Sequence, residues 1–478
     1  MAGRTPRHAR IGRLLAASAA PARAGHCLLP GLLLDYAPAA AEGGGPFFLP
    51  PFRNPPMEHV IDTIKARGLF DNWTDPGVYD LLKTPQTVYG GFDPSADSLQ
   101  AGNLVAIMNL CHYQRAGHRV LALVGGATGL IGDPSGKTSE RQLQTAETIA
   151  HNAECIKAQL ERFIDFGPGE RQALLVNNLD WLGKFSFIDY LRDVGRYFRM
   201  GTMLNKESVR ARLESPNGMS FTEFCYQTMQ GYDFLHLYDT YGCRVEVGGS
   251  DQWGNITAGT DLLHYQRGAS CYGVTIPLIK DSAGKKFGKS EGNAMYLDSK
   301  KTSCYQFYQF FLRSEDSVVV RYLKAFTFLP LDEIAQLEES VRTAPEKREA
   351  QRVLAEDVVR RVHGDEGLAQ AQRATQALFG GSLKGLSAAD LLPIFQDAPS
   401  AELPAADVVG QPVVKVAALA GLLKSQSEAR RMADGGGLYL NNERVGAADL
   451  VSEDRVIDGQ VLVLRAGKKN QRVVKLAR

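Results

Sequence analysis

Three polar side chains in one segment are spaced so that a helix would place them on a common face. Residues 220–238 contain Tyr226, Gln230 and Asp233 at positions i, i+4 and i+7, and no lysine or arginine. A solvated helix face, the alternative, would normally carry lysine, arginine or several glutamates. Hydroxyl, amide and carboxylate groups together could hold a small molecule with both hydrogen-bond donors and acceptors, so the stripe indicates a cavity.

The same segment carries the signals of a helix start. Ser220 and Glu223 stand three residues apart, as a capping box requires. We therefore expect a helix over 220–238 that also packs against a core. Its second, mostly apolar face consists of Phe221, Phe224, Cys225, Thr228 and Leu235.

Length and charge bound the organisation of the chain. With 478 residues it is too long for one compact core and predicts two or three domains. The formal net charge of +1 is unevenly distributed, because residues 413–478 hold 12 lysines and arginines against 7 acidic residues. The end of the chain from Arg465 contains no aspartate or glutamate. Such a segment suits binding to a nucleic-acid phosphate backbone, but a solvated terminus without a binding role can have the same composition.

Cysteine use and hydropathy exclude two classes of protein. The seven cysteines are odd in number, scattered, and never form a Cys-x-x-Cys pair, which indicates a reducing compartment. The longest apolar runs, around residues 28–34, are far shorter than a bilayer span. We therefore expect a protein that is not integral to a membrane.

Residues 1–56 differ in composition from the rest of the chain. They are rich in alanine, arginine, proline and glycine, and contain no acid before Asp35. A transit peptide would have this bias, whereas a secretory signal would need an uninterrupted apolar core. Patterned sequence begins at Met57, so we expect 1–56 to be a disordered or non-native extension, with Met57 slightly favoured as the true start.

Beyond residue 86, strand and helix patterns alternate. This is typical of a parallel α/β sheet, in which glycines directly after strand ends mark the edge that binds ligands. Residues 302–379 instead predict a helical domain. The expected elements are strands at 87–89, 119–124, 174–176, 244–247 and 274–277, and helices at about 103–115, 333–339 and 346–362.

One glycine-rich run looks like a phosphate-binding loop, but its spacing excludes that assignment. Residues 132–138 read GDPSGKT, but a P-loop needs four residues between its glycines and only three stand here. The same strand end lacks the spacing of a dinucleotide-binding fingerprint, and the sequence shows no metal-ligand cluster or nucleophile elbow.

The strongest signals are four motifs that follow one another along the chain. They read YGGFDPSADSLQAGN at 89–103, GGATGLIGD at 125–133, GGSDQWGN at 248–255 and KFGKS at 286–290. In this order they resemble a bacterial-type tyrosyl-tRNA synthetase. The resemblance runs from about Met57 to the C-terminus, and the combination is far more specific than any single motif.

The resemblance implies a tyrosine–tRNA ligase. Tyrosine would attack the α-phosphate of ATP to give tyrosyl-adenylate and pyrophosphate, and the tyrosyl group would then pass to the 3′ end of a tRNA. The implied fold class is α/β. Its parts are a Rossmann-like parallel-sheet catalytic domain at 57–300, an α-helical anticodon-side domain at 301–400, a linker at 401–411, and a small α+β RNA-binding module at 412–478.

The 286–290 motif suits phosphate chemistry. Lys286 and Lys289 sit in a loop punctuated by glycines, so two ammonium groups could neutralise the charge that grows on the leaving pyrophosphate. A solvated lysine-rich turn is the alternative. The resemblance assigns the loop the catalytic role, adds the hydroxyl of Ser290, and matches Lys137 and Arg141 to positions that assist on the pyrophosphate side.

One motif departs from the family pattern. The usual His-x-Gly-His element reads Gln100-Ala-Gly-Asn103 here. The amides of Gln100 and Asn103 can still donate hydrogen bonds to phosphate oxygens, but they never carry a charge. Neutral donors stabilise an anion less than charged ones do. We therefore expect this change to affect the rate of the reaction and not its type.

The resemblance also implies the substrate contacts, and no editing domain is visible. For tyrosine, these are Tyr89 and Asp233 at the phenolic hydroxyl, Asp133, Tyr226 and Gln230 at the ammonium group, and Gln252 near the carboxylate. For ATP, they are Gly91, Asp93, Ser95, Gly102, Gly249, Asp251 and Lys289.

The C-terminal segment resembles a small RNA-binding module shared with a ribosomal small-subunit protein. A short helix bearing Arg430 and Arg431, then a glycine turn and strands, would present cations to an RNA backbone. Lys468 and Lys469 in the acid-free end would add to them.

The expected partners are tRNA, ATP and L-tyrosine, with Mg²⁺ accompanying ATP, no permanently bound cofactor and no metal site of the protein's own. The resemblance implies a homodimer. We expect it in a bacterial cytoplasm, with a mitochondrial matrix as the alternative because both compartments are reducing. Two other functions stay open. An RNA-binding paralogue with little catalysis is motivated by Gln100 and Asn103, and a small-molecule nucleotidyl transferase would not need residues 412–478.

Overall fold

The computed structural model describes residues 59–135, 143–169, 172–290, 293–378, 381–395, 399–467 and 470–477. The expected disordered or non-native extension at 1–56 lies outside the described residues.

The first region, called the sheet region, is built on a mixed sheet with the strand order β1-β6-β5-β2-β3-β4. Neighbouring strands are parallel except for β1, which pairs antiparallel with β6 at the edge. The strands are β1 (Asn72–Trp73), β2 (Thr87–Phe92), β3 (Arg119–Val124), β4 (Leu174–Asn177), β5 (Cys243–Gly249) and β6 (Tyr272–Ile276), with a separate ribbon of β7 (Lys289–Ser290) and β8 (Asn293–Ala294).

Helices cover both faces of this sheet. The helices of this region are α1 (Val60–Ala66), α2 (Gly77–Leu81), α3 (Leu104–Arg115), α4 (Thr128–Ile131), α5 (Ala146–Leu160), α6 (Leu179–Leu182), α7 (Phe187–Asp193), α8 (Met200–Leu204), α9 (Glu207–Leu213), α10 (Phe221–Tyr241) and α11 (Trp253–Arg267). The expected α/β class with a parallel sheet is confirmed, as are the expected helices at 103–115 and 220–238 and the strand at 119–124.

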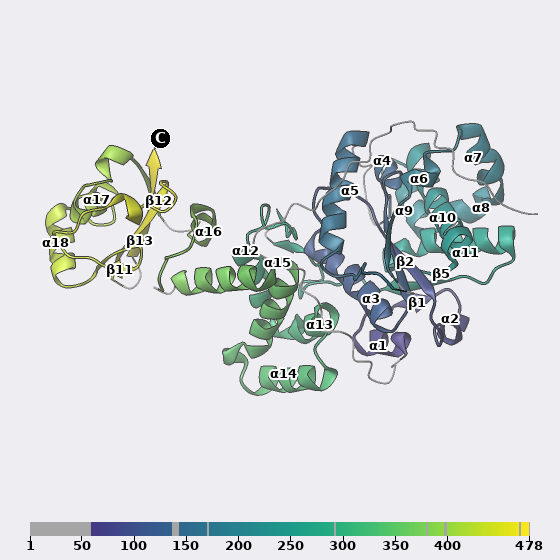
Figure 1. Cartoon of the computed structure of the whole chain (residues 1–478), viewed down its shortest axis with the longest axis horizontal. Coiled ribbons are helices and arrows are strands. Elements are labelled where there is room, and N and C mark those ends of the chain that lie inside the picture. Colours follow the sequence, from purple (N-terminus) through teal and green to yellow (C-terminus); the bar gives the residue numbers. More distant parts are fainter. Residues whose placement is uncertain are drawn as a thin grey trace, which may run out of the picture. The chain divides into compact units, whose positions relative to one another are not determined.

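Successive side chains of each strand point to opposite faces of the sheet, and each face packs into a separate hydrophobic cluster. Val88 and Val120 pack in the cluster that contains α3 and α5. Tyr89 and Leu121 point to the opposite face, into the cluster that contains α10 and α11. Figure 1 shows these two helix pairs on opposite sides of β2. The long polar helix α10 therefore covers the same face as Tyr89.

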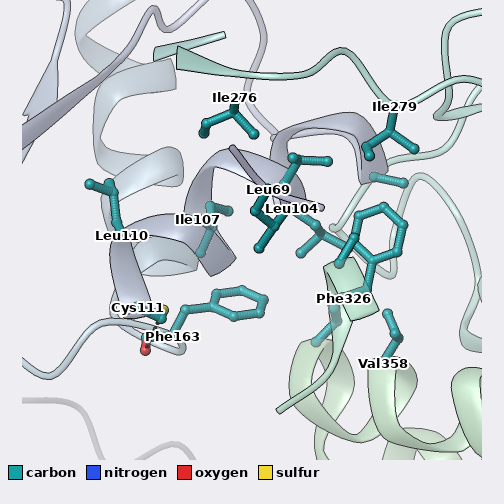
Figure 2. Packing of buried hydrophobic residues seen from close by; sticks show 14 of the residues in the cluster. Leu69, Leu104, Ile107, Leu110, Cys111, Phe163, Ile276, Ile279, Phe326 and Val358 are labelled. Carbon is teal, nitrogen blue, oxygen red and sulfur yellow. Dashed lines mark hydrogen bonds between the residues drawn. The ribbon is translucent and has the colours of Figure 1, made fainter. Parts of the chain in front are cut away.

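A helical region follows, and it shares its core with α3. Its helices are α12 (Cys304–Leu312), α13 (Asp316–Phe326), α14 (Leu331–Thr343) and α15 (Glu349–Leu378). Phe326 of α13 and Val358 of α15 belong to the same buried cluster as Leu104 and Ile107 of α3, and Figure 2 shows these side chains together. Apolar burial on this scale couples the helical region to the sheet.

The C-terminal region forms a separate sheet with the order β11-β10-β12-β13-β9. Its elements are α16 (Ala388–Ile394), β9 (Ser400–Pro404), α17 (Val413–Leu419), α18 (Gln426–Asp434), β10 (Leu438–Leu440), β11 (Glu443–Arg444), β12 (Val461–Ala466) and β13 (Asn470–Ala477).

The expectation of a linker at 401–411 is wrong for its first part. Residues 400–404 form β9, which pairs in parallel with β13 along its whole length. The proline-rich composition of this stretch suggested a loop, but an edge strand tolerates proline because one side of its backbone needs no partner. The sheet of the module therefore begins before residue 401.

Gly364 interrupts α15 in a conformation that other residues rarely adopt, with φ 75° and ψ −179°. A Cβ at this position would meet no heavy atom within 4 Å, so strain alone opposes substitution. We expect Gly364→Ala to lower the free energy of unfolding by about 1–3 kcal/mol, measured by chemical denaturation.

The matched control is Gly201→Ala in α8, where a Cβ is equally free of neighbours and the glycine has no positive φ. That change should be neutral or slightly stabilising, because alanine is the better helix former. Equal effects of the two substitutions would contradict the prediction.

Candidate active site

Two adjoining cavities open at the carboxyl ends of β2 and β5, where the strand order reverses direction along the sheet. This edge is where open parallel sheets bind ligands. The first, the carboxyl cavity, has a volume of about 280 Å³ and is lined by Asp93, Asp133, Asp233 and Glu246 among others. The second, the loop cavity, has a volume of about 440 Å³ and lies between residues 93–106 and 276–287. Asp93, Asn103, Asp251 and Lys286 line both cavities, so the two are continuous.

Every residue expected to contact tyrosine lines the carboxyl cavity: Tyr89, Asp133, Tyr226, Gln230, Asp233 and Gln252. Tyr89 and Asp233 are each only 2% exposed and Tyr226 is 5% exposed. The helix N-cap is also present, because Ser220 accepts a hydrogen bond from the backbone N–H of Glu223. The polar stripe of α10 therefore faces a cavity and not solvent.

Asp233 is held by two donors that motif reasoning did not identify. Nε1 of Trp181 donates to Oδ1 at 2.7 Å, and Nδ2 of Asn178 donates to Oδ2 at 2.9 Å. Burial raises the pKa of Asp233 to about 8, although both hydrogen bonds favour the ionised form. The carboxyl group is therefore fixed in place and mainly protonated at neutral pH.

Asp93 joins α10 to the end of β2. It accepts a hydrogen bond from the hydroxyl of Tyr226 at 2.8 Å and another from the hydroxyl of Thr128 at 2.8 Å. Burial, followed by the charges of Asp93 and Asp133, raises the pKa of Tyr226 well above its usual value. Tyr226 therefore remains a neutral hydrogen-bond donor at any ordinary pH.

Asp133 is surrounded by donors from η3 (Ser250–Gln252) and α11. Nε2 of Gln252 donates to Oδ2 at 2.6 Å, Nδ2 of Asn255 lies 3.3 Å from Oδ1, and the backbone N–H of Ser135 donates to Oδ1 at 3.0 Å. The carboxylate is thus oriented at the wall of the cavity by three separate segments.

The Gln100–Asn103 turn forms a reciprocal cap on η1 (Ala101–Asn103). Oδ1 of Asn103 accepts from the backbone N–H of Gln100 at 2.9 Å, and the side chain of Gln100 accepts from the backbone N–H of Asn103. Each amide thus uses its oxygen within the turn, which leaves its NH₂ group to donate elsewhere. Both residues line the loop cavity.

The 286–290 loop packs directly on this turn. Gly288 has φ 102°, and a Cβ there would lie 2.8 Å from the backbone nitrogen of Gly102. A Cβ on Gly102 would in turn lie 3.1 Å from the carbonyl oxygen of Phe287. Only two glycines allow the backbones to approach this closely. The contact places the loop at the wall of the loop cavity.

Lys286 reaches the cavities from this loop. Its Nζ lies 3.7 Å from Oδ2 of Asp251, and its side chain is 68% exposed, so the ammonium group is free to move onto an anion. Burial raises the pKa of Asp251, and the charge of Lys286 opposes that rise.

Several expected site residues cannot be placed. Lys137, Arg141, Lys468 and Lys469 lie outside the described residues, and the side chains of Lys289 and Ser290 are not described. Gly91, Ser95 and Gly249 line the carboxyl cavity, and Gly102 lines the loop cavity. Arg430 and Arg431 lie on α18 of the C-terminal module, exposed and apart from either cavity.

The residues missed by sequence reasoning left weak signals. Asn178 follows β4 directly, a position next to the ligand edge of a parallel sheet. Glu246 interrupts the apolar run of β5 between two buried valines, where a charged side chain is unusual. Trp181 carried no signal in the sequence.

Within the described residues, no group of three or more histidine, cysteine, aspartate or glutamate side chains is arranged to hold a metal ion. No described helix is long and apolar enough to cross a membrane.

The fold and site define the class of protein. Residues 82–380 match the family of class I tRNA synthetases (W and Y), and residues 390–474 match the C-terminal domain of tyrosine–tRNA ligases. The chain belongs to the class I tRNA synthetases for tryptophan and tyrosine.

Known relatives narrow this class further. The tyrosine–tRNA ligase of Roseiflexus castenholzii is 48% identical over 88% of this chain and 100% of its own length. That of Geobacillus kaustophilus is 49% identical over 87% of this chain and 100% of its own length. The C-terminally truncated mitochondrial tyrosyl-tRNA synthetase of Aspergillus nidulans aligns with a TM-score of 0.60 and 31% identity, over 67% of this chain and 94% of that one. Within its class, the chain belongs to the tyrosine–tRNA ligases.

The raised pKa of Asp233 predicts a pH-dependent stability. An ordinary aspartate titrates near 3.8, whereas folded Asp233 titrates at about 8, so between these values the folded chain holds a proton that the unfolded chain has lost. Stability must then fall as pH rises through this window, by up to about 1.4 kcal/mol per pH unit. We expect Asp233→Asn to make the decline between pH 6 and pH 8 shallower.

Urea denaturation followed by tryptophan fluorescence measures this decline, because all 3 tryptophans, Trp73, Trp181 and Trp253, lie in the sheet region. The control is Asp239→Asn on the same helix, whose carboxylate forms a surface ion pair with Arg267. The control should keep the wild-type slope, and an unchanged slope in Asp233→Asn would contradict the assignment.

Proposed function

We propose that this chain activates L-tyrosine with ATP and transfers the tyrosyl group to the 3′ end of its tRNA. The observation that carries this proposal is the continuity of the two cavities. A phenol-sized space lined by Tyr89 and Asp233 adjoins a second space bounded by the 286–287 segment and the Gln100–Asn103 turn. An amino acid and a nucleotide could therefore lie end to end, with their reacting groups at the shared wall.

The amino-acid end suits a phenol that carries an ammonium group. Tyr89 and Asp233 offer a hydroxyl and a carboxyl group at the buried end of the cavity, where an analogue without a phenolic hydroxyl would leave them unpaired. Asp133, Tyr226 and Gln230 supply oxygens for the ammonium group. Gln252, which donates to Asp133, would also approach the substrate carboxylate.

The nucleotide end suits phosphate. Lys286 supplies a mobile positive charge, and the free amide NH₂ groups of Gln100 and Asn103 supply neutral donors. Mg²⁺ would enter as part of the substrate, held mainly by phosphate oxygens, with Asp93 or Asp251 at hand as carboxylate partners. Lys289 and Ser290 belong to the same loop and would add to these contacts.

The C-terminal module suits the tRNA. Arg430 and Arg431 are exposed on α18, and the adjoining β10 and β12 bring Arg465 over the ring of Tyr439 at 3.8 Å. Cations beside an aromatic ring are typical of surfaces that bind nucleic acid. We propose that this module holds tRNA while the 3′ end reaches the cavities.

An apolar surface supports a homodimer. Of the 15 exposed large hydrophobic side chains among the described residues, 8 fall between residues 179 and 221, on α6 to α10. Their crowding into one short stretch is typical of a protein–protein interface. They are Leu179, Phe187, Ile188, Leu191, Met200, Leu204, Leu213 and Phe221.

The compartment we propose is a bacterial cytoplasm, with a mitochondrial matrix as the alternative. The six described cysteines are all free, as in a reducing compartment. The relatives from Roseiflexus and Geobacillus are bacterial proteins.

Tyrosine-dependent ATP–pyrophosphate exchange tests the first step. We expect Lys286→Ala to slow the exchange by about 100-fold, because it removes one charged contact to the leaving group. The matched control, Lys285→Ala, changes the neighbouring exposed lysine, which lines neither cavity, and should leave the rate unchanged.

Wild-type exchange no faster than that of Lys286→Ala would favour an RNA-binding paralogue. Charging of tRNA with labelled tyrosine tests the second step. Exchange without charging would favour a nucleotidyl transferase that acts on a small acceptor.

Sedimentation velocity tests the dimer. Phe221 is the first residue of α10 and 67% exposed, so Phe221→Glu places a charge in the apolar surface while an acid in the first turn still suits the helix. We expect this variant to sediment mainly as a monomer at concentrations where the wild type is a dimer. Leu331→Glu, which changes the first residue of α14 and lies outside the surface, should remain dimeric. A dimeric Phe221→Glu would contradict the assignment of this surface.

A further inference from the structure

Glu246 is a buried carboxyl group in the carboxyl cavity to which the sequence motifs assign no role. It lies on β5 and is 2% exposed. The register of the parallel pair aligns it with Tyr89 on β2, so both side chains point to the face that α10 and α11 cover. Its Oε2 is buried against α11, where a Cβ on Gly259 would come within 3.4 Å of it.

Gln230 makes a directional contact to the carboxyl group of Glu246. Nε2 of Gln230 donates to Oε1 of Glu246 at 2.8 Å. An ionised carboxylate accepts hydrogen bonds and cannot donate them, so it must face the amide nitrogen of Gln230 and not the amide oxygen. The amide oxygen of Gln230 is then left on the side away from Glu246. Gln230 itself lines the cavity, and so does Asp133, which is also an acceptor.

Burial raises the pKa of Glu246 to about 7. The hydrogen bond from Gln230, the hydroxyl of Tyr89 and the charge of Lys206 oppose that rise. The other titratable groups that face it are Tyr89 on β2, Asp233 on α10 and Cys243 on its own strand. Burial raises the pKa of Tyr89 well above its usual value, and the charges of Glu246 and Asp233 add to that rise.

We propose that Glu246 is a positioning residue of the amino-acid site: it turns the amide oxygen of Gln230 toward the cavity and thereby selects a substrate that presents an ammonium group there. This inference rests on the proposed function, because it concerns how the same cavity recognises tyrosine. Ionised Glu246 also adds negative charge close to the bound ammonium group, so tyrosine should bind more tightly when Glu246 is ionised.

The first test removes the acceptor. Glu246→Leu should raise the KM for L-tyrosine in pyrophosphate exchange by about tenfold, with the kcat and the KM for ATP little changed, because the oriented hydrogen bond to a charged group is lost. The probe without an ammonium group is 3-(4-hydroxyphenyl)propionate, used as a competitive inhibitor. Its inhibition constant should be the same for the variant and the wild type.

The second test keeps the shape and removes the charge. Glu246→Gln still offers a carbonyl oxygen to Gln230 but never ionises. The wild-type KM for L-tyrosine should fall several-fold between pH 6 and pH 8, as a carboxyl group with a pKa of about 7 loses its proton. Asp233 and Lys206, each with a pKa of about 8, titrate in the same range in both proteins. Dividing the KM of Glu246→Gln by the wild-type KM at each pH therefore isolates the effect of Glu246. This ratio should rise with pH.

A matched control is Glu223→Gln, which removes another buried carboxylate of the same region, one paired with Arg212 and outside the cavity. It should lower the Tm and keep the wild-type pH profile.

Three results would overturn the inference. They are an unchanged KM for L-tyrosine in Glu246→Leu, an equal loss of affinity for the probe without an ammonium group, and a Glu246→Gln profile parallel to wild type. If Glu246→Leu fails to fold, the Glu246→Gln profile decides alone. Absence of exchange in the wild type would instead contradict the proposed function.

Discussion

The site depends on keeping several carboxyl groups out of water beside one another. Asp93, Asp133, Asp233 and Glu246 all line a single cavity, and an ionised carboxylate without donors would be costly to bury there. Each of them therefore has at least one donor supplied from elsewhere in the chain: Tyr226 and Thr128 for Asp93, Gln252 and Asn255 for Asp133, Asn178 and Trp181 for Asp233, and Gln230 for Glu246. Burial raises the pKa values of Asp233 and Glu246 to about 8 and about 7, so at these two positions burial outweighs the donors.

The parallel sheet makes this arrangement possible. Strand ends converge at one edge, so β2, β4 and β5 deliver Asp93, Asn178 and Glu246 to the same region from sequence positions far apart. The helix α10 closes the region from one face and contributes Tyr226, Gln230 and Asp233 at helical spacing. We propose that such a cavity, with carboxyl groups in its walls and the mobile cation of Lys286 at its mouth, attracts an amino acid by its ammonium group and a nucleotide by its phosphates.

The loop cavity is built differently from the carboxyl cavity. Two backbone segments lie in close contact at its wall, and its charge comes from a mobile lysine. Gly102 and Gly288 let the 286–290 loop lie directly on the Gln100–Asn103 turn. The amide oxygens of that turn are used to cap η1, which leaves donor groups but no permanent charge. Because of this difference from the family's histidine pattern, we expect the electrostatic stabilisation of the phosphates to come mainly from the lysines of the loop.

Much of this was readable from the order of the residues. Helical spacing predicted that Tyr226, Gln230 and Asp233 share a face, and glycines after apolar strands predicted the ligand edge, because both follow from local backbone geometry. The motifs and the relatives agree on a tyrosine–tRNA ligase.

The hydrogen-bond donors that come from distant segments could not be predicted from the sequence. Trp181 and Asn178 reach Asp233 only because β4 and α6 fold beside α10. Glu246 meets Gln230 only through the register of β5. The strand at 400–404 was missed for the same reason, since its partner β13 lies about 70 residues further along the chain. Local spacing decides which side chains share an element, whereas long-range packing decides which groups compensate one another's burial.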